Sequence, residues 1–499
     1  MARQTVIQIA AGVLSGALIL LSGPEPALGY LAFICLVPAL AILPMSGHRG
    51  VLLVGTTAGI ASSIGKVYWI AETIANYGGL PLSIGVFTTA LLVAYLSLYS
   101  LAFFSMASRL DPASCLFPWA CASIWVALEW IQAHLLTGFP WMLLGYTQSN
   151  MLPVLQSARI WGVYGISFLL VLVNASIAAV QIQGRSAWRG AIGPCLLLSA
   201  TLLYGLTSEG GMPREHALRV GIVQGSIPQR LKWQQDARDV TMDRYASLTR
   251  ELSGSRVDFV VLPETAFPFF LTHPANDPYF TRARDLAREM NAPILVGGLS
   301  NDDGNILNRV FLISPTGALL GHQDKVHLVP FGEYLPLEWI FGYLEGLTRE
   351  SGRFTPGAEH RALHLPGRDL PFGVFICYES IFPEIARTFA RSGARFLVNV
   401  TNDAWFGTTA APYQHFAMGV FRAVENGLPL IRCANTGISG AVDASGRVLA
   451  STRLFEPTSL VVEIYPRRER TFYTRYGDVP VALCALISLG ALALQRRRR

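Results

Sequence analysis

The feature that most constrains this chain is a series of apolar stretches that fills residues 1–210. A helix needs about 20 apolar residues to cross the roughly 30 Å hydrocarbon core of a bilayer, where its backbone groups must be satisfied internally. Seven stretches in this region are close to that length, and another follows near the end of the chain. We therefore predict a multi-span α-helical bundle of about eight spans, near 6–22, 29–45, 50–71, 81–107, 115–135, 160–182, 190–206 and 479–494.

The segment 137–158 and the start of the chain need a separate interpretation. Residues 137–158 are rich in Gly, Pro and Trp, which favours an interfacial or re-entrant loop over another span. The basic start of the chain could belong to a signal peptide. Because no clear cleavage site follows and more apolar stretches come at once, we interpret this start as the first span.

The basic residues predict the orientation of the spans. The alternate loops 23–28, 72–80 and 136–158 contain no Lys or Arg. The other loops and the chain ends carry Arg3, His48, Arg49, Arg109, Arg185, Arg189 and the run Arg496, Arg497, Arg498 and Arg499. Cytoplasmic loops are the positively charged ones, so both termini are predicted in the cytoplasm and the polar region on the far side of the membrane, in the periplasm. This topology signal also explains the net charge of +6 better than nucleic-acid binding does.

The polar region reads as an α/β domain. Its short β-branched runs, such as those at 218–227, 257–263 and 371–377, are continuously apolar, as in strands buried on both faces. Helical patterns intervene, which indicates a layered domain. The predicted organisation is a membrane bundle over 1–211, a catalytic domain over 212–470, and a last span with a basic tail over 471–499.

The cysteines argue against a metal centre or a disulfide framework. Five of the seven lie in or beside apolar segments, where we expect them to be small buried hydrophobes. Only Cys377 and Cys433 fall in the polar region, and no CxxC pair or zinc spacing occurs. We predict no metal and no cofactor, and we interpret Cys433 as a core residue.

Three reactive side chains each follow an apolar strand of the polar region. They are Glu264 in VVLPETAF, Lys325 in GHQDKVHLVP and Cys377 in FGVFICYES. Taken singly, a cysteine after a strand is usually buried core, and a lone Lys or Glu is usually a surface charge. Together they suffice for acyl transfer: a nucleophilic thiol, a carboxylate as its base, and an amine that stabilises the oxyanion with the Tyr378 backbone amide.

These segments resemble the nitrilase superfamily over about 212–470, and this resemblance implies a Glu–Lys–Cys triad on a four-layer α-β-β-α sandwich. The motifs GSIPQRLKW, HLVPFGEYLP, VTNDAWFG and QHFAMGVFRAVENGLPLIRCANTG narrow it to the apolipoprotein N-acyltransferase family, a membrane-bound branch. The resemblance implies Glu264 as base, Lys325 as oxyanion stabiliser and Cys377 as nucleophile. It also implies supporting roles for Glu333, Tyr378 and Glu379, and a site lined by Trp233 and Asn308.

The same resemblance implies a reaction in two steps. A phospholipid, typically phosphatidylethanolamine, gives an acyl chain to Cys377 as a thioester. The α-amino group of the diacylglyceryl-cysteine of an apolipoprotein then takes the acyl chain. The implied partners are the phospholipid donor, the diacylated apolipoprotein acceptor and the bilayer of a bacterial inner membrane, with no nucleic acid, and nothing requires more than a monomer. Two alternatives stay open: an anchored amidase that resolves the thioester with water, and a transporter with an extracytoplasmic domain.

A few other residues stand out from the pattern. Residues 337–347 are apolar enough to dip into the membrane interface or to form a packed surface helix. Lys66, Glu72 and Glu129 fall in or near spans, where charge is costly; they either snorkel or line a substrate path. His415 sits on a predicted helix, and we interpret it as structural.

Overall fold

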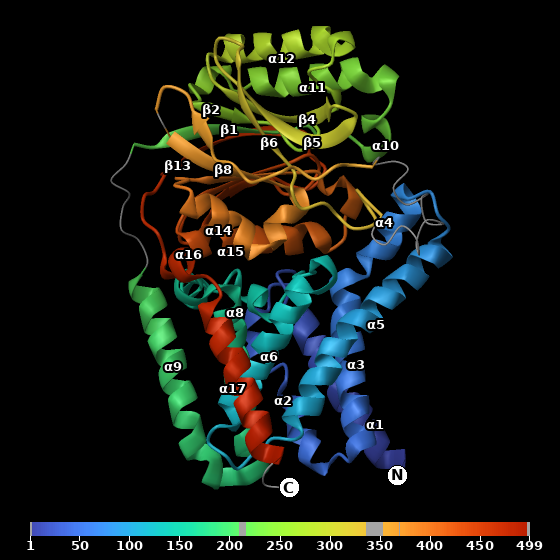
Figure 1. The fold of residues 1–499 in the computed structure, drawn as a ribbon, viewed down its shortest axis with the longest axis vertical. Coiled ribbons are helices and arrows are strands. Elements are labelled where there is room, and N and C mark those ends of the chain that lie inside the picture. Colours follow the sequence, from blue (N-terminus) through green and yellow to red (C-terminus); the bar gives the residue numbers. More distant parts are fainter. Residues whose placement is uncertain (1, 209–215, 336–352, 369, 497–499) are drawn as a thin grey trace. The chain divides into compact units, whose positions relative to one another are not determined.

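The computed structural model describes residues 2–208, 216–335, 353–368 and 370–496. The chain forms two compact units, which are treated one at a time below (Figure 1). The helical unit comprises Met1–Ala71, Ser83–Glu209 and Arg475–Arg499. The α/β unit comprises Glu72–Leu82 and Gly210–Thr474.

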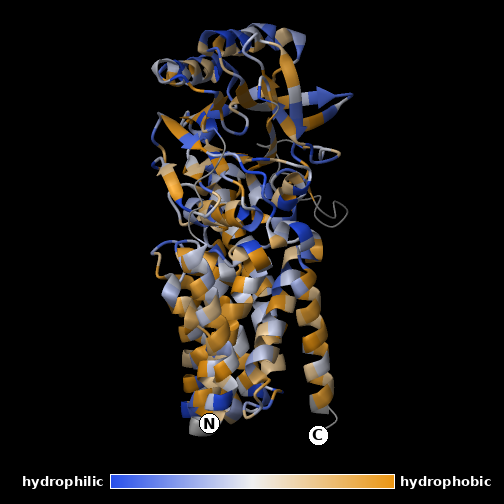
Figure 2. Cartoon of the chain, turned by 90° about the vertical axis from the view of Figure 1, so that its left-hand side faces the viewer, coloured by the Kyte–Doolittle hydropathy of each residue, from blue (hydrophilic) through white to orange (hydrophobic). Residues whose placement is uncertain are grey.

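The helical unit contains long apolar helices of the length that a bilayer requires. Among the described residues, five helices are long and apolar enough to cross a membrane: α1 (Ala2–Leu21), α3 (His48–Val67), α5 (Leu82–Ala107), α8 (Ala158–Gln183) and α9 (Trp188–Thr207). Figure 2 shows these helices largely in the colours of hydrophobic residues. On α9, Leu196, Leu203 and Leu206 are each more than 60% exposed. Such a surface suits lipid rather than water.

Two shorter apolar helices also belong to this unit. Helix α6 (Phe117–His134) covers most of the predicted span 115–135, and α17 (Val479–Arg496) covers the predicted span 479–494. The two helices pack against each other. The predicted span 50–71 ends earlier than expected, because α3 stops at Val67 and α4 (Trp69–Tyr77) follows.

The predicted span 29–45 is not one continuous helix. It consists of η1 (Gly29–Phe33), α2 (Val37–Ile42) and η2 (Leu43–Met45). Pro38 and Pro44 lie at the first turns of the second and third pieces; proline has no N–H to continue a helix. The interrupted backbone is satisfied by Asn174 of α8, whose side chain accepts from Leu36 N at 2.7 Å and donates to Ala32 O at 2.8 Å.

The segment 137–158 is also not a span, in agreement with the prediction. It forms η4 (Leu144–Gln148) and α7 (Leu152–Leu155) between irregular stretches. Its backbone is held by side chains of neighbouring helices. Glu129 of α6 accepts from Leu144 N at 2.7 Å, and Ser167 of α8 accepts from Gly145 N at 2.8 Å.

The α/β unit contains two mixed sheets. The first has the order β13-β1-β2-β4-β5-β6, with β3 beside β4. Its strands are β1 (Leu218–Gln224), β2 (Phe259–Val261), β3 (Phe267–Phe270), β4 (Ile294–Asp302), β5 (Asn305–Ile313), β6 (Leu319–Asp324) and β13 (Thr458–Ile464). The second has the order β12-β11-β10-β9-β8-β7. Its strands are β7 (Leu363–Leu365), β8 (Leu370–Ile376), β9 (Leu397–Thr401), β10 (Leu430–Ala434), β11 (Gly440–Val442) and β12 (Val448–Ser451).

The two sheets share one apolar core. Ile222 and Phe259 of the first sheet meet Phe372 and Val398 of the second, and the rings of Phe259 and Phe372 lie 5.4 Å apart. The outer face of the first sheet packs on α11 (Arg238–Arg250) and α12 (Asp277–Met290). Helices α14 (Pro383–Arg391) and α15 (Ala411–Asn426) pack on the second sheet (Figure 1). Burial on both faces explains why these strands read as continuous apolar runs.

Candidate active site

Two of the three predicted catalytic residues stand at sharp turns that follow strands. Strand β8 ends at Ile376, and Cys377 opens the short helix η10 (Cys377–Ile381) with φ of +52°. Glu264 follows β2, and the next residue, Thr265, has φ of +44°. Residues other than glycine rarely adopt this left-handed conformation, and the strain that it costs is concentrated at functional sites.

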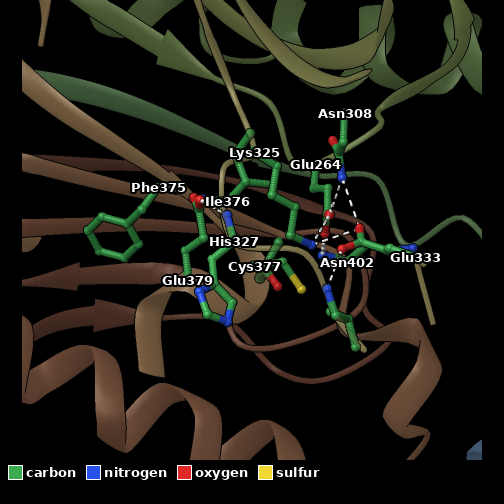
Figure 3. Close-up of polar contacts among 12 residues, drawn as sticks. Glu264, Asn308, Lys325, His327, Glu333, Phe375, Ile376, Cys377, Glu379 and Asn402 are labelled. Atoms are coloured by element: carbon green, nitrogen blue, oxygen red, sulfur yellow. Dashed lines mark hydrogen bonds and ion pairs between the residues drawn. The ribbon is translucent and has the colours of Figure 1, made fainter. Parts of the chain in front are cut away.

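The amine of Lys325 lies between two carboxylates (Figure 3). Lys325 follows β6, and its Nζ is 2.8 Å from Glu333 Oε1 and 3.4 Å from Glu264 Oε1. Burial alone would lower the pKa of this amine, but Glu333 and then Glu264 outweigh burial, so the pKa is raised above its usual value. Lys325 is therefore a permanent cation at the centre of the site.

Glu264 is held by donors on both oxygens. Its Oε1 accepts from Asn308 Nδ2 at 2.8 Å, and its Oε2 accepts from the Asn402 backbone N–H at 2.7 Å. Lys232 donates from Nζ to the backbone carbonyl of Glu264 at 3.0 Å. Asn402 and Lys232 were not predicted as site residues, although both lie in the quoted motifs VTNDAWFG and GSIPQRLKW.

The Cys377 side chain points toward the same place as the Lys325 amine and the Glu264 carboxylate (Figure 3). Only 8% of this residue is exposed. Burial, followed by the negative charge of Glu264, raises the pKa of the thiol to about 12, and Lys325 opposes this shift. The resting thiol is therefore protonated at neutral pH, and a thiol must lose its proton to act as a nucleophile. The carboxylate of Glu264, which faces the same place, is a candidate acceptor for that proton (Figure 3).

Glu379 joins the segments that carry Lys325 and Cys377. Its Oε1 accepts from the backbone N–H groups of Val326 at 2.8 Å and His327 at 3.0 Å, and its Oε2 accepts from Ile376 N at 2.7 Å. His360 Nε2 is a further partner at 3.1 Å. Burial alone would raise the pKa of this fully buried carboxyl, but the hydrogen bond and charge of His360, with the backbone donors, lower it.

The other predicted residues occupy different positions around the triad. Glu333 accepts from Val329 N at 2.8 Å through Oε2, while Asn308 reaches its Oε1 at 3.4 Å. Tyr378 is buried against Phe382, with ring centroids 5.2 Å apart. Trp233 belongs to a small apolar cluster that contains Leu299, Leu328 and Phe354. The structure therefore joins Glu264, Lys325, Glu333 and Asn308 in one hydrogen-bonded network with the Cys377 side chain beside it (Figure 3), whereas Trp233 lies in an apolar cluster.

The remaining residues of note fall outside this network. Cys433 is fully buried, and its thiol donates to Val223 O and Val261 O, which fits a core residue. In the helical unit, Glu129 and Lys66 line a cavity with Ser62, Tyr99 and Gln132. Residues 337–347 lie outside the described part of the chain. Within that described part, no group of three or more His, Cys, Asp or Glu is placed to hold a metal ion.

Comparison with known families defines the class first. A family model described as carbon-nitrogen hydrolase matches residues 219–473, so the α/β unit and its site belong to that class. The model of the apolipoprotein N-acyltransferase N-terminal domain matches residues 15–176. Curated proteins named apolipoprotein N-acyltransferase match nearly the whole chain: one from Geobacter metallireducens is 39% identical over 504 residues, covering 98% of this chain and 95% of its own. The chain therefore belongs to the apolipoprotein N-acyltransferase family.

Further relatives agree with this assignment. A protein of the same name from Bradyrhizobium diazoefficiens is 36% identical over 428 residues, covering 82% of this chain and 78% of its own. Another from Vibrio cholerae is 32% identical over 473 residues, covering 92% of this chain and 91% of its own. Among solved structures, an amidase from Nesterenkonia sp. is 20% identical, covers 55% of this chain and 98% of its own, and has a TM-score of 0.40. The bacterial relatives and the apolar helices make this a bacterial membrane protein.

Proposed function

We propose that this protein transfers a fatty acyl chain from a phospholipid to the N-terminal α-amino group of the diacylglyceryl-cysteine of apolipoproteins. The observation that carries the proposal is the convergence of Cys377, Glu264 and Lys325 in one buried site. A thiol, a carboxylate and an amine are sufficient for acyl transfer through a covalent intermediate. The family names the acceptor class, and phosphatidylethanolamine is the proposed donor.

The first step forms a thioester. As Sγ of Cys377 attacks the ester carbonyl of the phospholipid, Glu264 takes the thiol proton. The developing oxyanion lies between the Lys325 ammonium and the Tyr378 backbone N–H, which stabilise it. When the tetrahedral intermediate collapses, the ester C–O bond breaks. Glu264 returns its proton to the departing oxygen, and a lysophospholipid leaves.

The second step forms an amide. The α-amine of the diacylated cysteine attacks the thioester carbonyl and gives a proton to Glu264. The same two donors stabilise the oxyanion. The C–S bond then breaks, and the Cys377 sulfur recovers the proton from Glu264. The product is a triacylated lipoprotein, and the site needs no cofactor in either step.

The proposal includes the arrangement in the membrane. Eight spans hold both termini in the cytoplasm and place the α-β-β-α catalytic domain in the periplasm, where the nucleophile works beside the bilayer surface. The charge bias of the short loops supports this orientation. The bilayer supplies the donor lipid, and a monomer is sufficient.

Two other functions give different outcomes in one assay. Purified protein in vesicles receives phospholipid with a labelled acyl chain and a diacylated lipopeptide. Label in an amide on the peptide supports the proposal, whereas labelled free fatty acid without N-acylated peptide indicates the amidase alternative. The transporter alternative predicts that Cys377→Ala keeps full activity.

A matched cysteine variant controls this assay. Cys433 is buried like Cys377 and also lies at a strand of the second sheet, but its thiol only donates to backbone carbonyls. We expect Cys377→Ala to abolish transfer and Cys433→Ala to retain most of it. Equal losses in both variants would show that the assay reports folding, and the roles assigned to Cys377 would fall.

A further inference from the structure

A second polar network lies directly behind the nucleophile. His415 of α15 is fully buried, and its Nε2 is 3.2 Å from the backbone carbonyl oxygen of Cys377 and 2.6 Å from Ser380 Oγ. Its Nδ1 is 3.0 Å from both Arg432 Nη2 and Asp403 Oδ1. The sequence identified His415 only as a structural residue, and the triad mechanism does not use it.

We assign the ring proton of His415 to Nε2 from the groups that face the two nitrogens. A carbonyl oxygen can only accept, so the Nε2 that faces Cys377 O carries a hydrogen. Burial, followed by the charge of Arg432, lowers the pKa of this imidazole against the opposing effect of Asp403, so the ring is neutral at neutral pH. In a neutral ring with a proton on Nε2, Nδ1 is an acceptor. Arg432, which has only donors, supplies the partner of Nδ1. The carboxylate of Asp403 also lies beside Nδ1 but cannot donate to it; its Oδ1 accepts from Thr401 Oγ1 at 2.9 Å and its Oδ2 from Arg432.

Arg432 is itself fixed in place. Its Nη2 donates to Asp403 Oδ2 at 2.7 Å, its Nε donates to Ile438 O at 3.2 Å, and its Nη1 donates to Asn399 Oδ1. All of these side chains except that of Ile438 are essentially inaccessible to solvent. The network therefore presents His415 Nε2–H to the Cys377 carbonyl in a single orientation.

The planarity of the peptide bond turns this contact into a constraint on the active site. The Cys377 carbonyl and the Tyr378 N–H belong to one trans peptide group, so they point in opposite directions. A donor that holds the carbonyl on the buried side therefore directs the N–H to the other side. Cys377 has φ of +52°, a conformation that residues other than glycine rarely adopt. The orientation of the Cys377–Tyr378 peptide group therefore depends on contacts such as the one with His415.

We propose that His415 is a positioning residue that aims the Tyr378 backbone N–H at the oxyanion by anchoring the Cys377 carbonyl. This inference rests on the proposed acyl transfer, since it assigns the second oxyanion donor of that reaction. It also gives Arg432 a purpose, which is to donate to Nδ1 and so leave the ring proton on Nε2, while Asp403 holds the guanidinium of Arg432 in place. His415 acts through the peptide and does not touch the substrate.

Two substitutions at this position separate the donor from the ring. The amide nitrogen of glutamine reaches about as far as Nε2, whereas the amide of asparagine reaches only about as far as Nδ1. His415→Gln therefore retains a donor for the Cys377 carbonyl, and His415→Asn retains only the contacts with Asp403 and Arg432. Loss of one oxyanion donor costs about 100-fold to 1000-fold in rate.

The test measures two reactions of Cys377 in the full-length variants. Thioester formation with labelled phospholipid passes through an oxyanion, but alkylation by iodoacetamide does not. We expect His415→Asn to slow thioester formation about 100-fold, with the phospholipid concentration at half-maximal rate and the alkylation rate both within about threefold of wild type. We expect His415→Gln to recover at least tenfold of that loss.

Each other outcome overturns the inference. Equal slowing of acylation and alkylation in His415→Asn would make His415 a structural residue. Wild-type acylation in His415→Asn, or equal defects in the Asn and Gln variants, would mean that the carbonyl contact is not what orients the donor. Absence of a thioester in the wild-type protein would instead refute the proposed function itself.

Discussion

Glu379 allows the sharpest quantitative prediction, because one buried carboxylate accepts from four donors on three segments. Glu379→Gln keeps the shape but replaces one acceptor oxygen with an NH2 group. If the amide nitrogen replaces Oε2, it faces the Ile376 N–H, and this donor loses its partner. An orphaned buried donor costs about 1–3 kcal/mol, and each remaining bond loses about 1 kcal/mol when its acceptor becomes neutral. The total is roughly 5 kcal/mol, within the range of the whole stability of many domains.

Hydrogen exchange measures this effect where it arises. We expect the backbone amides of Val326, His327 and Ile376 to exchange at least about 100-fold faster in Glu379→Gln, because each 1.4 kcal/mol is tenfold in an opening equilibrium. The rate of thioester formation should also fall in this variant, since the three amides flank Lys325 and Cys377. The control is Glu463→Gln, which makes the same chemical change in an ion pair with Arg219 whose side chains are 54% and 41% exposed. Such a pair contributes about 0–1 kcal/mol.

The pH dependence of this variant follows from the lowered pKa of Glu379. A carboxyl whose folded pKa lies below its unfolded value stabilises the protein above the unfolded pKa and loses this contribution as pH falls through the folded pKa. The advantage of wild type over Glu379→Gln should therefore be complete at neutral pH and shrink below about pH 4.5. Wild-type exchange at the three amides, or a constant difference across this pH range, would refute the reasoning.

Three further predictions follow from buried polar groups. Glu333→Gln removes the nearer of the two carboxylates that pair with Lys325. We expect thermal unfolding to show about 3–5 kcal/mol of destabilisation, and thioester formation to be slower. The control Glu289→Gln lies in an exposed pair with Arg250 and should change neither quantity. Burial lowers the pKa of Lys232 to about 7, so its buried ammonium form destabilises the folded state at low pH. Relative to wild type, Lys232→Met should be stabilised most below pH 7, and this difference should shrink as pH rises toward 10.5. A difference in unfolding free energy that grows with pH would contradict this prediction. Asn174→Leu leaves Leu36 N and Ala32 O unpaired; we expect about 1–3 kcal/mol of destabilisation and faster exchange confined to residues 32–36, and unchanged exchange there would show that water replaces the side chain.

The sequence indicated the three candidate residues of the triad for a physical reason. In α/β domains the ends of strands gather side chains into a crevice, so Glu264 after β2 of the first sheet and Cys377 after β8 of the second sheet were recognisable as candidates. Family motifs then supplied the pairing with Lys325. The sequence could not indicate which backbone groups hold these side chains. The contacts from Lys232 to the Glu264 carbonyl and from Asn402 N to its carboxylate depend on three-dimensional packing between distant segments.

In the helical unit, too, some features could be predicted from the sequence and others could not. Long apolar runs such as 81–107 correspond to a single helix, because length and hydropathy suffice to specify it. The run 29–45 is equally apolar, yet it breaks into short helices. Its prolines were visible, but the side chain that makes the break tolerable, Asn174, lies 138 residues from Leu36. Hydropathy therefore predicts which residues avoid water and does not predict where a helix is interrupted.

The central claim is that Cys377 carries the acyl group, and intact-protein mass spectrometry tests it most directly. The full chain is incubated with phospholipid of a single acyl composition and without acceptor. We predict a mass increase of one acyl chain that hydroxylamine removes, that maps to the peptide containing Cys377, and that is absent in Cys377→Ala. An adduct that persists in Cys377→Ala, or that maps to another residue, would contradict the account.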